Sequence, residues 1–260
     1  MAISELNKLP IWDKMQTIDL SEMKSIKLMN RIDTKFIANS DDLPRILEMA
    51  LDLYRVQSID GVRVARYDTL YYDTPDLAMY TMHHNRKLRR QKVRTRTYVE
   101  SDLSFLEVKN KTNKGRTKKK RIEISRETFF NIHSNGEAME FLNERSMFDP
   151  AILCPNVATR FDRITLVNKA KTERLTIDLN LEFESVATSV KVSPPRLMII
   201  ELKQDGLCHS DMKMILRELR IKPNKISKCC IGTALTNPNA KKNRFGVKIR
   251  KIEKITKAKL

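Results

Sequence analysis

The sequence predicts an α+β fold in which a β-barrel with a charged interior is covered on its outside by helices. Residues 88–124 are expected to form three consecutive strands, and each has charged residues at every second position. Because successive strand residues point to opposite faces, each strand then has one ionic face and one more apolar face. The same alternation returns in residues 31–35, 174–183 and 200–203. One such strand would be an ordinary surface strand, but so many ionic faces indicate a shared polar interior.

The charged rows contain many more cations than carboxylates. The rows are Arg31, Asp33 and Lys35; Lys92, Arg94 and Arg96; Glu107, Lys109 and Lys111; Lys119, Arg121 and Glu123; Arg174, Thr176, Asp178, Asn180 and Glu182; Glu201 and Lys203. An interior rich in lysine and arginine with a few carboxylates suits a polyanion together with a divalent metal ion.

The first 53 residues are expected to form helices around one ionic strand. Apolar residues recur with a helical spacing over residues 1–30, up to Met29, and Trp12 most simply packs in the core. The first ionic strand then spans residues 31–38. A further helix starts at residues 39–42, where capping residues precede an amphipathic stretch.

Residues 56–73 are expected to hold two strands joined by a turn, followed by a helix and the central strands of residues 88–124. Pro75 fits the first turn of that helix, which Asp73 and Thr74 can cap. Glycine and short polar residues mark the turns between strands. The expected turns lie at Asp60-Gly61, Ser101-Asp102 and Asn113-Lys114-Gly115.

The second half is expected to cover the barrel and complete it. Residues 126–148 are predicted to form one or two helices, split near Asn135-Gly136, on the outside of the sheet. A hairpin follows, and then a strand, a helix and a short helix or turn. These elements are expected over residues 155–167 with 174–183, then 197–204, 211–219 and 227–235.

The length and composition favour one domain with an anionic partner. The chain has 260 residues and a formal net charge of +18, from 50 basic and 32 acidic residues. We expect a single domain over residues 1–240, N-terminal helices included, followed by a basic, partly amphipathic tail over 241–260. The excess charge predicts a nucleic acid, an anionic lipid, a nucleotide or a phosphate polymer as partner.

Cysteine usage and hydropathy indicate a cytoplasmic protein. No apolar run approaches the roughly 18 to 20 residues of a membrane span, and the N-terminus has no signal segment. The cysteines lack metal-ligand spacing, so we expect reduced thiols and no zinc site. They are Cys154, Cys208, Cys229 and Cys230.

Eight short motifs occur in the order found in one known family. They are RIDTKF at 31–36, YDTLYYDTPDLAMY at 67–80, KVRTRTY at 92–98, LEVKNK at 106–111, KKKR at 118–121, RLTID at 174–178, IIELK at 199–203 and SKCCIG at 227–232. Together they resemble the catalytic domain of the vacuolar transporter chaperone, a polyphosphate polymerase of the triphosphate tunnel metalloenzyme superfamily. The resemblance covers roughly residues 28–236 and implies an eight-stranded antiparallel tunnel with a basic lumen.

The resemblance also implies roles for individual residues. Arg94 and Arg96 match the paired arginines that hold the nucleotide triphosphate, and Glu201 matches the metal-binding glutamate. The implied catalytic residues are Arg94, Arg96, Lys109 and Arg163. The implied phosphate-binding residues are Lys35, Arg31, Lys119, Arg121, Lys203, Ser227 and Lys228, with Glu201 as ligand of Mn²⁺ or Mg²⁺. Asp178, Glu107 and Glu123 are weaker metal candidates.

The chain departs from the family at several points. Phe161 stands where the family usually has tyrosine, and the first strand lacks the Glu-x-Glu-x-Lys signature of the superfamily's hydrolases. The inositol-phosphate-sensing domain and the membrane helices of the eukaryotic polymerases are also absent from this sequence. A separate membrane protein is therefore an expected partner for moving the polymer.

Three functions remain open. The first is a metal-dependent polymerase that transfers the γ-phosphate of ATP to inorganic polyphosphate, since phosphoryl transfer requires positioning and charge neutralisation above all. The second is a hydrolase of tripolyphosphate or nucleoside triphosphates, which the missing signature disfavours. The third is a non-catalytic module that binds polyphosphate or nucleic acid. Nucleic acid is disfavoured because the ionic rows contain almost no aromatic residues to stack bases.

The ionic residues also have purely structural explanations. The arginines and lysines could form surface salt bridges, and Glu201 could simply balance nearby lysines. Ser227 could be no more than a helix cap.

Overall fold

The computed structural model describes residues 1–26, 28 and 31–260, apart from the side chain of Lys24. Met29, expected among the N-terminal helical residues, lies outside the described residues. The central feature is one antiparallel sheet in which eight strands follow one another as β2-β11-β9-β8-β4-β5-β6-β7. Their bounds are β2 (Arg31–Asn39), β11 (Leu197–Asp205), β9 (Glu173–Ser185), β8 (Cys154–Asn168), β4 (Val64–Asp73), β5 (Arg90–Tyr98), β6 (Leu103–Lys111) and β7 (Thr117–Ile124).

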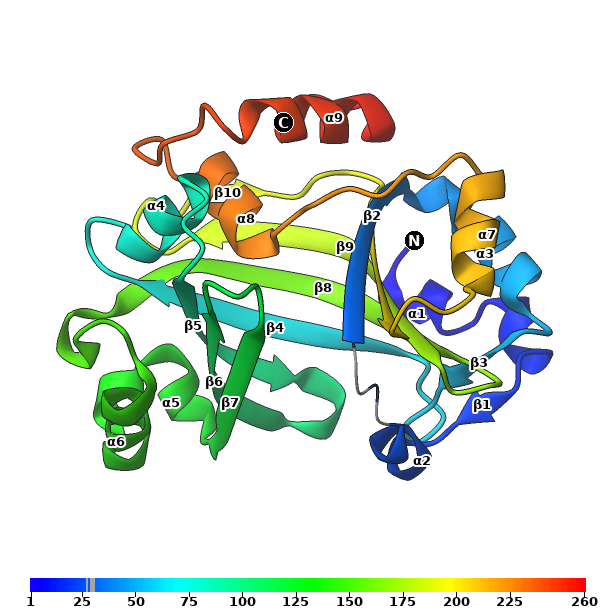
Figure 1. The fold of residues 1–260 in the computed structure, drawn as a ribbon, viewed down its shortest axis with the longest axis horizontal. Helices are drawn as coiled ribbons and strands as arrows, with labels where there is room; N and C mark the ends of the chain where they lie inside the picture. Colours follow the sequence, from blue (N-terminus) through cyan, green and yellow to red (C-terminus); the bar gives the residue numbers. More distant parts are fainter. Residues whose placement is uncertain (27, 29–30) are drawn as a thin grey trace.

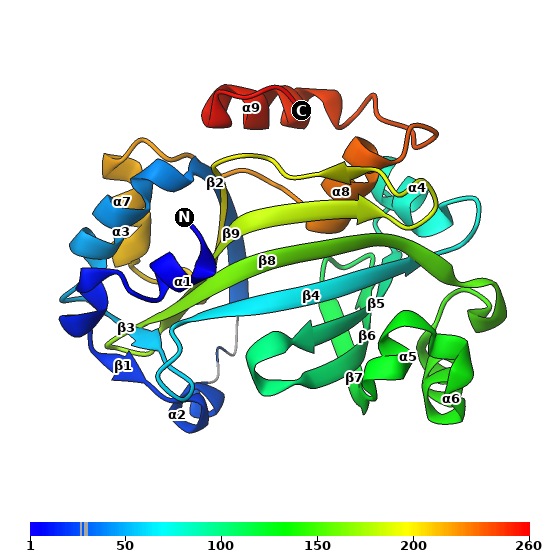
Figure 2. The same ribbon diagram turned by 180° about the vertical axis from the view of Figure 1, so that it is seen from behind.

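This sheet is curved, so that its two ends approach the same side of the long strands β8 and β9. Figures 1 and 2 show β2 and the β5–β7 arm on one side of β8 and β9, with β4 continuing the sheet between them. The predicted α+β class and the antiparallel arrangement of the main strands are confirmed. Three short strands extend the sheet at its margins: β1 (Thr17–Ile18), β3 (Tyr54–Gln57) and β10 (Lys191–Val192).

The strand register confirms that the charged rows share one face. Lys35 lies opposite Glu201, Arg94 lies opposite Glu107, and Glu107 lies opposite Arg121 on its other side. Since directly opposed residues point to the same side of a sheet, these rows line the concave face together.

One row was predicted incorrectly beyond Asp178. The β8–β9 register shifts between Arg160 and Asp162, and Asn180 adopts a left-handed backbone with φ of 49°. Glu182 therefore pairs with Arg160, and the Asn180 amide donates a hydrogen bond to Asp162 at 2.7 Å. A bulge of this kind moves the following residues to the opposite face of the strand, so Asn180 and Glu182 do not continue the row of Asp178.

The barrel is not closed by strand pairing in the described part of the chain, because β7 and β2 are not hydrogen-bonded to each other. A loop covers the outer edge of β2 instead. The Asn224 N–H donates to the carbonyl of Lys35 at 2.7 Å, and Phe36 forms an isolated bridge with Pro223. The expected tunnel is thus a curved sheet whose edge at β2 is covered by residues 223–224.

Helices cover the apolar convex face at both ends of the sheet. α3 (Leu43–Ala50) and α7 (Asp211–Glu218) pack on the outer residues of β2, β11 and β9, in a core that includes the fully buried Leu43, Leu47 and Leu216. α5 (Arg126–Phe130) and α6 (Gly136–Arg145) pack on the outer residues of β5 and β6. The expected split at Asn135-Gly136 is confirmed, since the Asn135 side chain caps α6.

α8 (Lys228–Thr236) is an exception to the prediction that helices lie outside. It packs on the concave face against Phe183 and Val157, above the inward residues of β8 and β9. Gly232 permits this contact because a Cβ there would lie 2.7 Å from the Phe183 ring. α8 therefore fills one end of the concave face, and its N-terminus points toward the charged residues.

Smaller elements follow the predictions with local differences. Trp12 is buried, as expected. β3 pairs with β1 and β8 rather than forming a hairpin with β4. α4 (Ala78–His84) starts three residues after Pro75, but the Asp73 carboxylate and the Thr74 hydroxyl do accept its first N–H groups. The helical prediction for residues 1–30 is only partly right, since the short helices α1 (Ile3–Leu6) and α2 (Leu20–Ser25) are separated by β1, which pairs with β3.

The basic segment 241–260 contains a packed helix, α9 (Gly246–Thr256). Ile252 and Phe245 are buried in the same core as Ile37 of β2 and Tyr80 of α4. Among the described residues, no helix is long and apolar enough to span a membrane.

Candidate functional site

Three carboxylates on the concave face each hold two cations. Glu107 lies on β6, Asp178 on β9 and Glu201 on β11, so neighbouring and distant strands contribute to one surface. Each carboxylate is paired with two cations, so each cluster has a net positive charge. This arrangement suits a polyanion better than a neutral ligand.

The Glu107 cluster is formed within the β5–β7 arm. Arg94 contacts Glu107 at 2.6 Å and donates to the Tyr71 hydroxyl at 3.1 Å, while Lys119 binds the other carboxylate oxygen. Burial by itself would raise the pKa of Glu107, but the charges of Arg94, Arg96 and Lys119 lower it to about 2. Glu107 is therefore ionised at neutral pH and fixes the direction of the Arg94 guanidinium.

The Asp178 cluster joins β8, β9 and α8. Arg163 makes two hydrogen bonds to Asp178, at 2.6 and 2.9 Å, and Lys228 contacts the same carboxylate. Despite burial, these two cations hold the pKa of Asp178 well below its usual range. Burial is also the main reason why the pKa of Lys228 falls to about 8, with Arg163 and Lys35 acting in the same direction.

The Glu201 cluster joins β2 and β11. Lys35 and Lys203 contact the two oxygens of Glu201 at 2.7 and 3.0 Å. Burial opposes ionisation, but the two lysines hold the pKa of Glu201 well below its usual range. The Glu201 side chain is 19% exposed, whereas Glu107 and Asp178 are each 1% exposed. Of the three carboxylates, Glu201 is thus the one that a ligand can reach.

Further cations lie between these clusters without a salt bridge among the described residues. Lys92 donates to the Ser227 hydroxyl at 2.7 Å, and Arg96 donates to Thr69 at 3.2 Å. Lys109 lies on β6, directly opposite Lys92 on the concave face. Burial among protein atoms, together with the charges of nearby cations, lowers its pKa to about 8.

The charge environment of Lys109 shows that the two ends of the sheet face each other. Its pKa responds to Glu201 and Lys35, which lie on β11 and β2, as well as to Lys92 and Arg94 of the adjacent strand. Since β6 and β2 lie toward opposite ends of the strand order, only the curvature of the sheet brings these charges together.

An aromatic surface supports three of the cations. Phe161 and Tyr67 stack with ring centroids 5.4 Å apart, and Arg163 lies over both rings at 5.1 and 4.6 Å. Arg96 also lies over both, and the Lys228 ammonium lies 4.5 Å from the centre of the Phe161 ring. Phe161 is 1% exposed. It thus supports the cations through its ring face and lacks the hydroxyl expected from the family.

Some predicted residues lie at the margin, and some neighbours were not predicted. Arg31 is largely exposed and pairs with Asp33 at 2.8 Å, while the exposed Arg121 packs over Phe105 at 4.2 Å. Glu123, a weaker metal candidate, is exposed on β7. Lys92 was not among the predicted site residues, although its place in the row of Arg94 and Arg96 is a usable signal. Nothing in the sequence indicated that Tyr67 and Tyr71 belong to the site, since aromatic residues in strands are usually part of the core.

A divalent ion would depend on the substrate for most of its ligands. The described residues contain no group of three histidine, cysteine or carboxylate side chains placed to hold a metal. Each Glu201 oxygen accepts from one lysine and keeps a further lone pair. This fits Mg²⁺ or Mn²⁺ bound by one carboxylate with phosphate oxygens and water, as Mg²⁺ sites on phosphate substrates commonly are.

The fold and the site define a protein with a curved antiparallel sheet, whose concave face presents arginines and lysines paired with carboxylates. The VTC domain model matches residues 30–237, which is most of the chain, and the protein belongs to the VTC domain family. The resemblance found in the sequence motifs is thereby confirmed. No protein with a curated description matches the sequence.

Solved structures share the fold at low sequence identity. An adenylyl cyclase-like protein from Hippeastrum, described as having a dominant triphosphatase activity, is 16% identical, with a TM-score of 0.52. The match covers 80% of this chain and 98% of that chain. An adenylate cyclase-like protein from Vibrio parahaemolyticus is 9% identical over 77% of this chain and 96% of that chain, with a TM-score of 0.45. The fold likeness rests on the first of these.

Proposed function

We propose that this protein is a polyphosphate polymerase, which transfers the γ-phosphate of ATP to the end of an inorganic polyphosphate chain. The observation that supports this most is the charge arrangement of the concave face. Glu107, Asp178 and Glu201 are each held by two cations, and Lys92, Arg96 and Lys109 remain beyond them. Membership of the VTC domain family supports the same substrate class.

In this proposal the arginines bind the reacting phosphates. Arg94, Arg96 and Arg163 have fixed guanidinium directions, since each is held by a carboxylate, a threonine or an aromatic ring. A guanidinium can donate two parallel hydrogen bonds to phosphate oxygens, so a fixed direction aligns donor and acceptor phosphates. Lys109, Lys35 and Lys228 supply point charges near the non-bridging oxygens. Glu201 would hold the divalent ion, which when bound neutralises charge on the phosphate oxygens.

The protonation of the site favours a phosphate acceptor over water. The end of a polyphosphate chain is already anionic and needs no base, whereas water must lose a proton. The three carboxylates are poor bases because paired cations hold their pKa values low, to about 2 for Glu107.

The second candidate is a triphosphatase. The similar fold of the Hippeastrum protein, which is described as having a dominant triphosphatase activity, favours it. The same cations would bind a triphosphate, and the two reactions differ only in the acceptor.

Product analysis separates the candidates. The purified protein is incubated with ATP and Mn²⁺ or Mg²⁺, with and without a short polyphosphate primer, and polymer, ADP and free phosphate are measured. A polymer ladder with ADP, lost in Arg94→Ala and kept in the surface variant Arg217→Ala on α7, supports the polymerase. ADP with an equal amount of free phosphate and no polymer establishes the hydrolase. Binding without turnover under either metal ion overturns both.

A further inference from the structure

The helix α9 lies outside the residues that match the family, and it is fixed to the body of the protein. The Asn39 side chain of β2 donates to the carbonyl of Ile255 at 3.2 Å, and the Tyr80 hydroxyl donates to the carbonyl of Lys241 at 2.7 Å. Phe245 packs against Tyr80 and His84 of α4. The apolar side of α9 is thus used inside the protein, which leaves its polar side as the accessible one.

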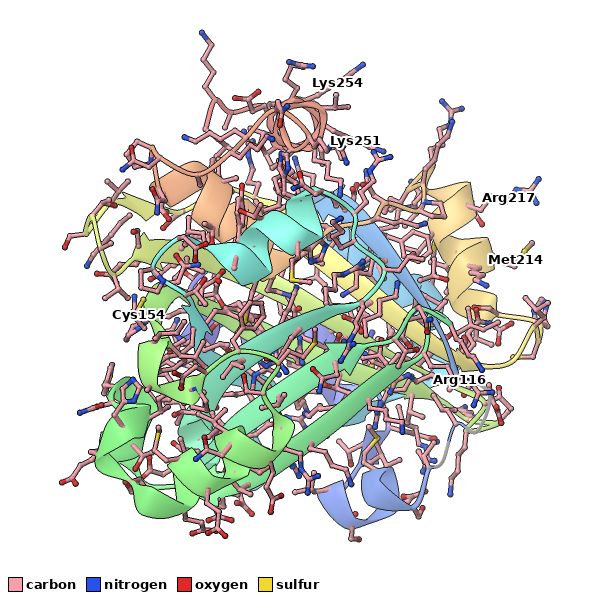
Figure 3. The ribbon with its side chains drawn as sticks, turned by 60° about the vertical axis from the view of Figure 1, so that its left-hand side comes forward. Arg116, Cys154, Met214, Arg217, Lys251 and Lys254 are labelled. Atoms are coloured by element: carbon pink, nitrogen blue, oxygen red, sulfur yellow. The ribbon has the colours of Figure 1, made fainter. Side chains whose placement is uncertain are left out.

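The accessible side of α9 and its flanks is almost purely cationic. Glu253 is the only acidic residue of segment 241–260, and its carboxylate accepts from the Leu260 N–H at 3.1 Å. Figure 3 shows Lys251 and Lys254 on the outer side of the helix. The exposed cations are Lys241, Lys242, Arg244, Arg250, Lys251, Lys254, Lys257 and Lys259.

Like charges lead from the site along β5 and β6. Lys92 lies directly opposite Lys109, and the next pair on the same face, one step toward the strand ends, is Arg90 opposite Lys111. None of the four forms a salt bridge within the described part of the chain. Like charges directly across a strand pair destabilise a sheet, so two successive pairs are best explained by an anion that binds between them.

The charges continue from these strands to α9 through the loop before α8. Burial, together with the charges of Arg90 and Lys225, lowers the pKa of Lys111. Burial, together with Arg86 and Lys225, likewise lowers the pKa of Lys248 on α9. The exposed Lys225 lies in the chain between Asn224, which donates to the Lys35 carbonyl, and Ser227, which accepts from Lys92, so the loop itself places it beside the strand pair.

We propose that this basic surface, from Arg90 and Lys111 past Lys225 to the exposed side of α9, binds the linear polyphosphate chain beyond the site of transfer. The inference rests on the proposed function. A linear polyanion matches a continuous row of cations, and a chain held there would stay bound between additions. A lipid surface fits less well, because Ile249, Ile252 and Ile255 of α9 pack into the protein and leave Val247 as the one exposed apolar residue of this helix.

The test compares long and short phosphate chains on the full-length protein. In Lys251→Glu/Lys254→Glu, affinity for long-chain polyphosphate should fall about tenfold at low salt, with a smaller salt dependence. Affinity for tripolyphosphate should stay within about twofold, since that ligand fits inside the concave face. The matched control is Arg45→Glu/Arg217→Glu on α3 and α7, which makes the same change in net charge at exposed positions. It should leave both affinities near those of the unaltered protein.

Several results would overturn the inference. One is an equal loss of long-chain binding in the control, which would mean a general effect of net charge. Another is a loss of tripolyphosphate binding in the α9 variant, which would mean that α9 only supports the fold. A third is unchanged long-chain binding with lost binding to phosphatidylserine vesicles, which would assign α9 to membranes. Binding needs no turnover, so a failed polymerase assay is distinguishable from a failure here.

Discussion

Glu107 and Glu201 are two glutamates on the same concave face, each between two cations, yet their surroundings differ. Glu107 is 1% exposed and its partners Arg94 and Lys119 come from adjacent strands. Glu201 is 19% exposed and is held by two lysines at the edge of the sheet. Under the proposed function, Glu107 orients an arginine and stabilises the arm, whereas Glu201 exchanges its lysines for a ligand.

The largest expected effect concerns Glu201. Glu201→Gln should lower the rate of ATP turnover about 10²–10³-fold, because in the proposed function Glu201 would hold the divalent ion, and a neutral amide is a much weaker ligand for it than a carboxylate. Unfolding in urea should change by less than about 1 kcal/mol, since the site is partly open to solvent. Steady-state kinetics and urea unfolding of the same preparation check both parts. A large loss of stability with normal turnover would reverse the roles given to the two glutamates.

Glu107→Gln should show the opposite balance. Removing the charge leaves Arg94 and Lys119 uncompensated beside a buried amide, so the free energy of unfolding should fall by about 3 kcal/mol. Glu123→Gln, on the same face but exposed on β7, is the matched control and should cost less than about 0.5 kcal/mol. Equal stability of the two variants would contradict the structural role of Glu107.

Phe161→Leu tests the aromatic support shared by Arg96, Arg163 and Lys228. Losing several cation–ring contacts of about 0.5–1 kcal/mol each should weaken tripolyphosphate binding about tenfold. Isothermal titration measures the affinity. Phe105→Leu removes a ring that lies under Arg121 at the margin and beside Tyr98, and it should change the affinity less than about twofold. Similar losses in both variants would mean that the position of Phe161 is not special.

The smallest effect is a pH dependence from Lys109. Its pKa is about 8 in the folded protein and 10.5 ordinarily, so its charge is lost as pH rises through about 8 and phosphate affinity should fall a few-fold. Between these values the unfolded chain holds the proton that the folded one has lost, so this group makes stability rise with pH. Titrations with tripolyphosphate from about pH 7 to about pH 9.5 measure the first effect. Lys109→Arg should reduce the pH dependence and leave the part due to Lys228, whose pKa is also about 8, and an unchanged profile would exclude Lys109.

The charged rows could be predicted because a strand repeats every two residues, so Arg94 and Glu107 were placed on a common face correctly. The turn at Asn113-Lys114-Gly115 was also predicted, and it joins β6 to β7 with Gly115 at a φ of 77°. The bulge at Asn180 could not be predicted, because an asparagine within a strand does not by itself indicate a bulge. That single residue decides that Glu182 leaves the concave face.

The position of α8 was also beyond the sequence pattern. Its residues are apolar on nearly all sides, which suits a buried helix but does not say which face of the sheet covers it. Gly232 is informative only once Phe183 is known to lie 2.7 Å from its missing Cβ. Likewise, the partners of Lys35 and Lys228 depend on contacts between residues far apart in the chain, which periodicity cannot supply.

The loop over the edge of β2 leads directly into the N-terminus of α8. Pro223 and Asn224 hold that edge, and Ser227 and Lys228 follow within one turn, bound to Lys92 and Asp178. Detaching the loop would therefore withdraw two ligand-facing groups at once. Ligand binding and attachment of the loop to β2 are therefore coupled. A ligand bound through Ser227 or Lys228 stabilises the attached loop by the same free energy by which the attached loop stabilises ligand binding.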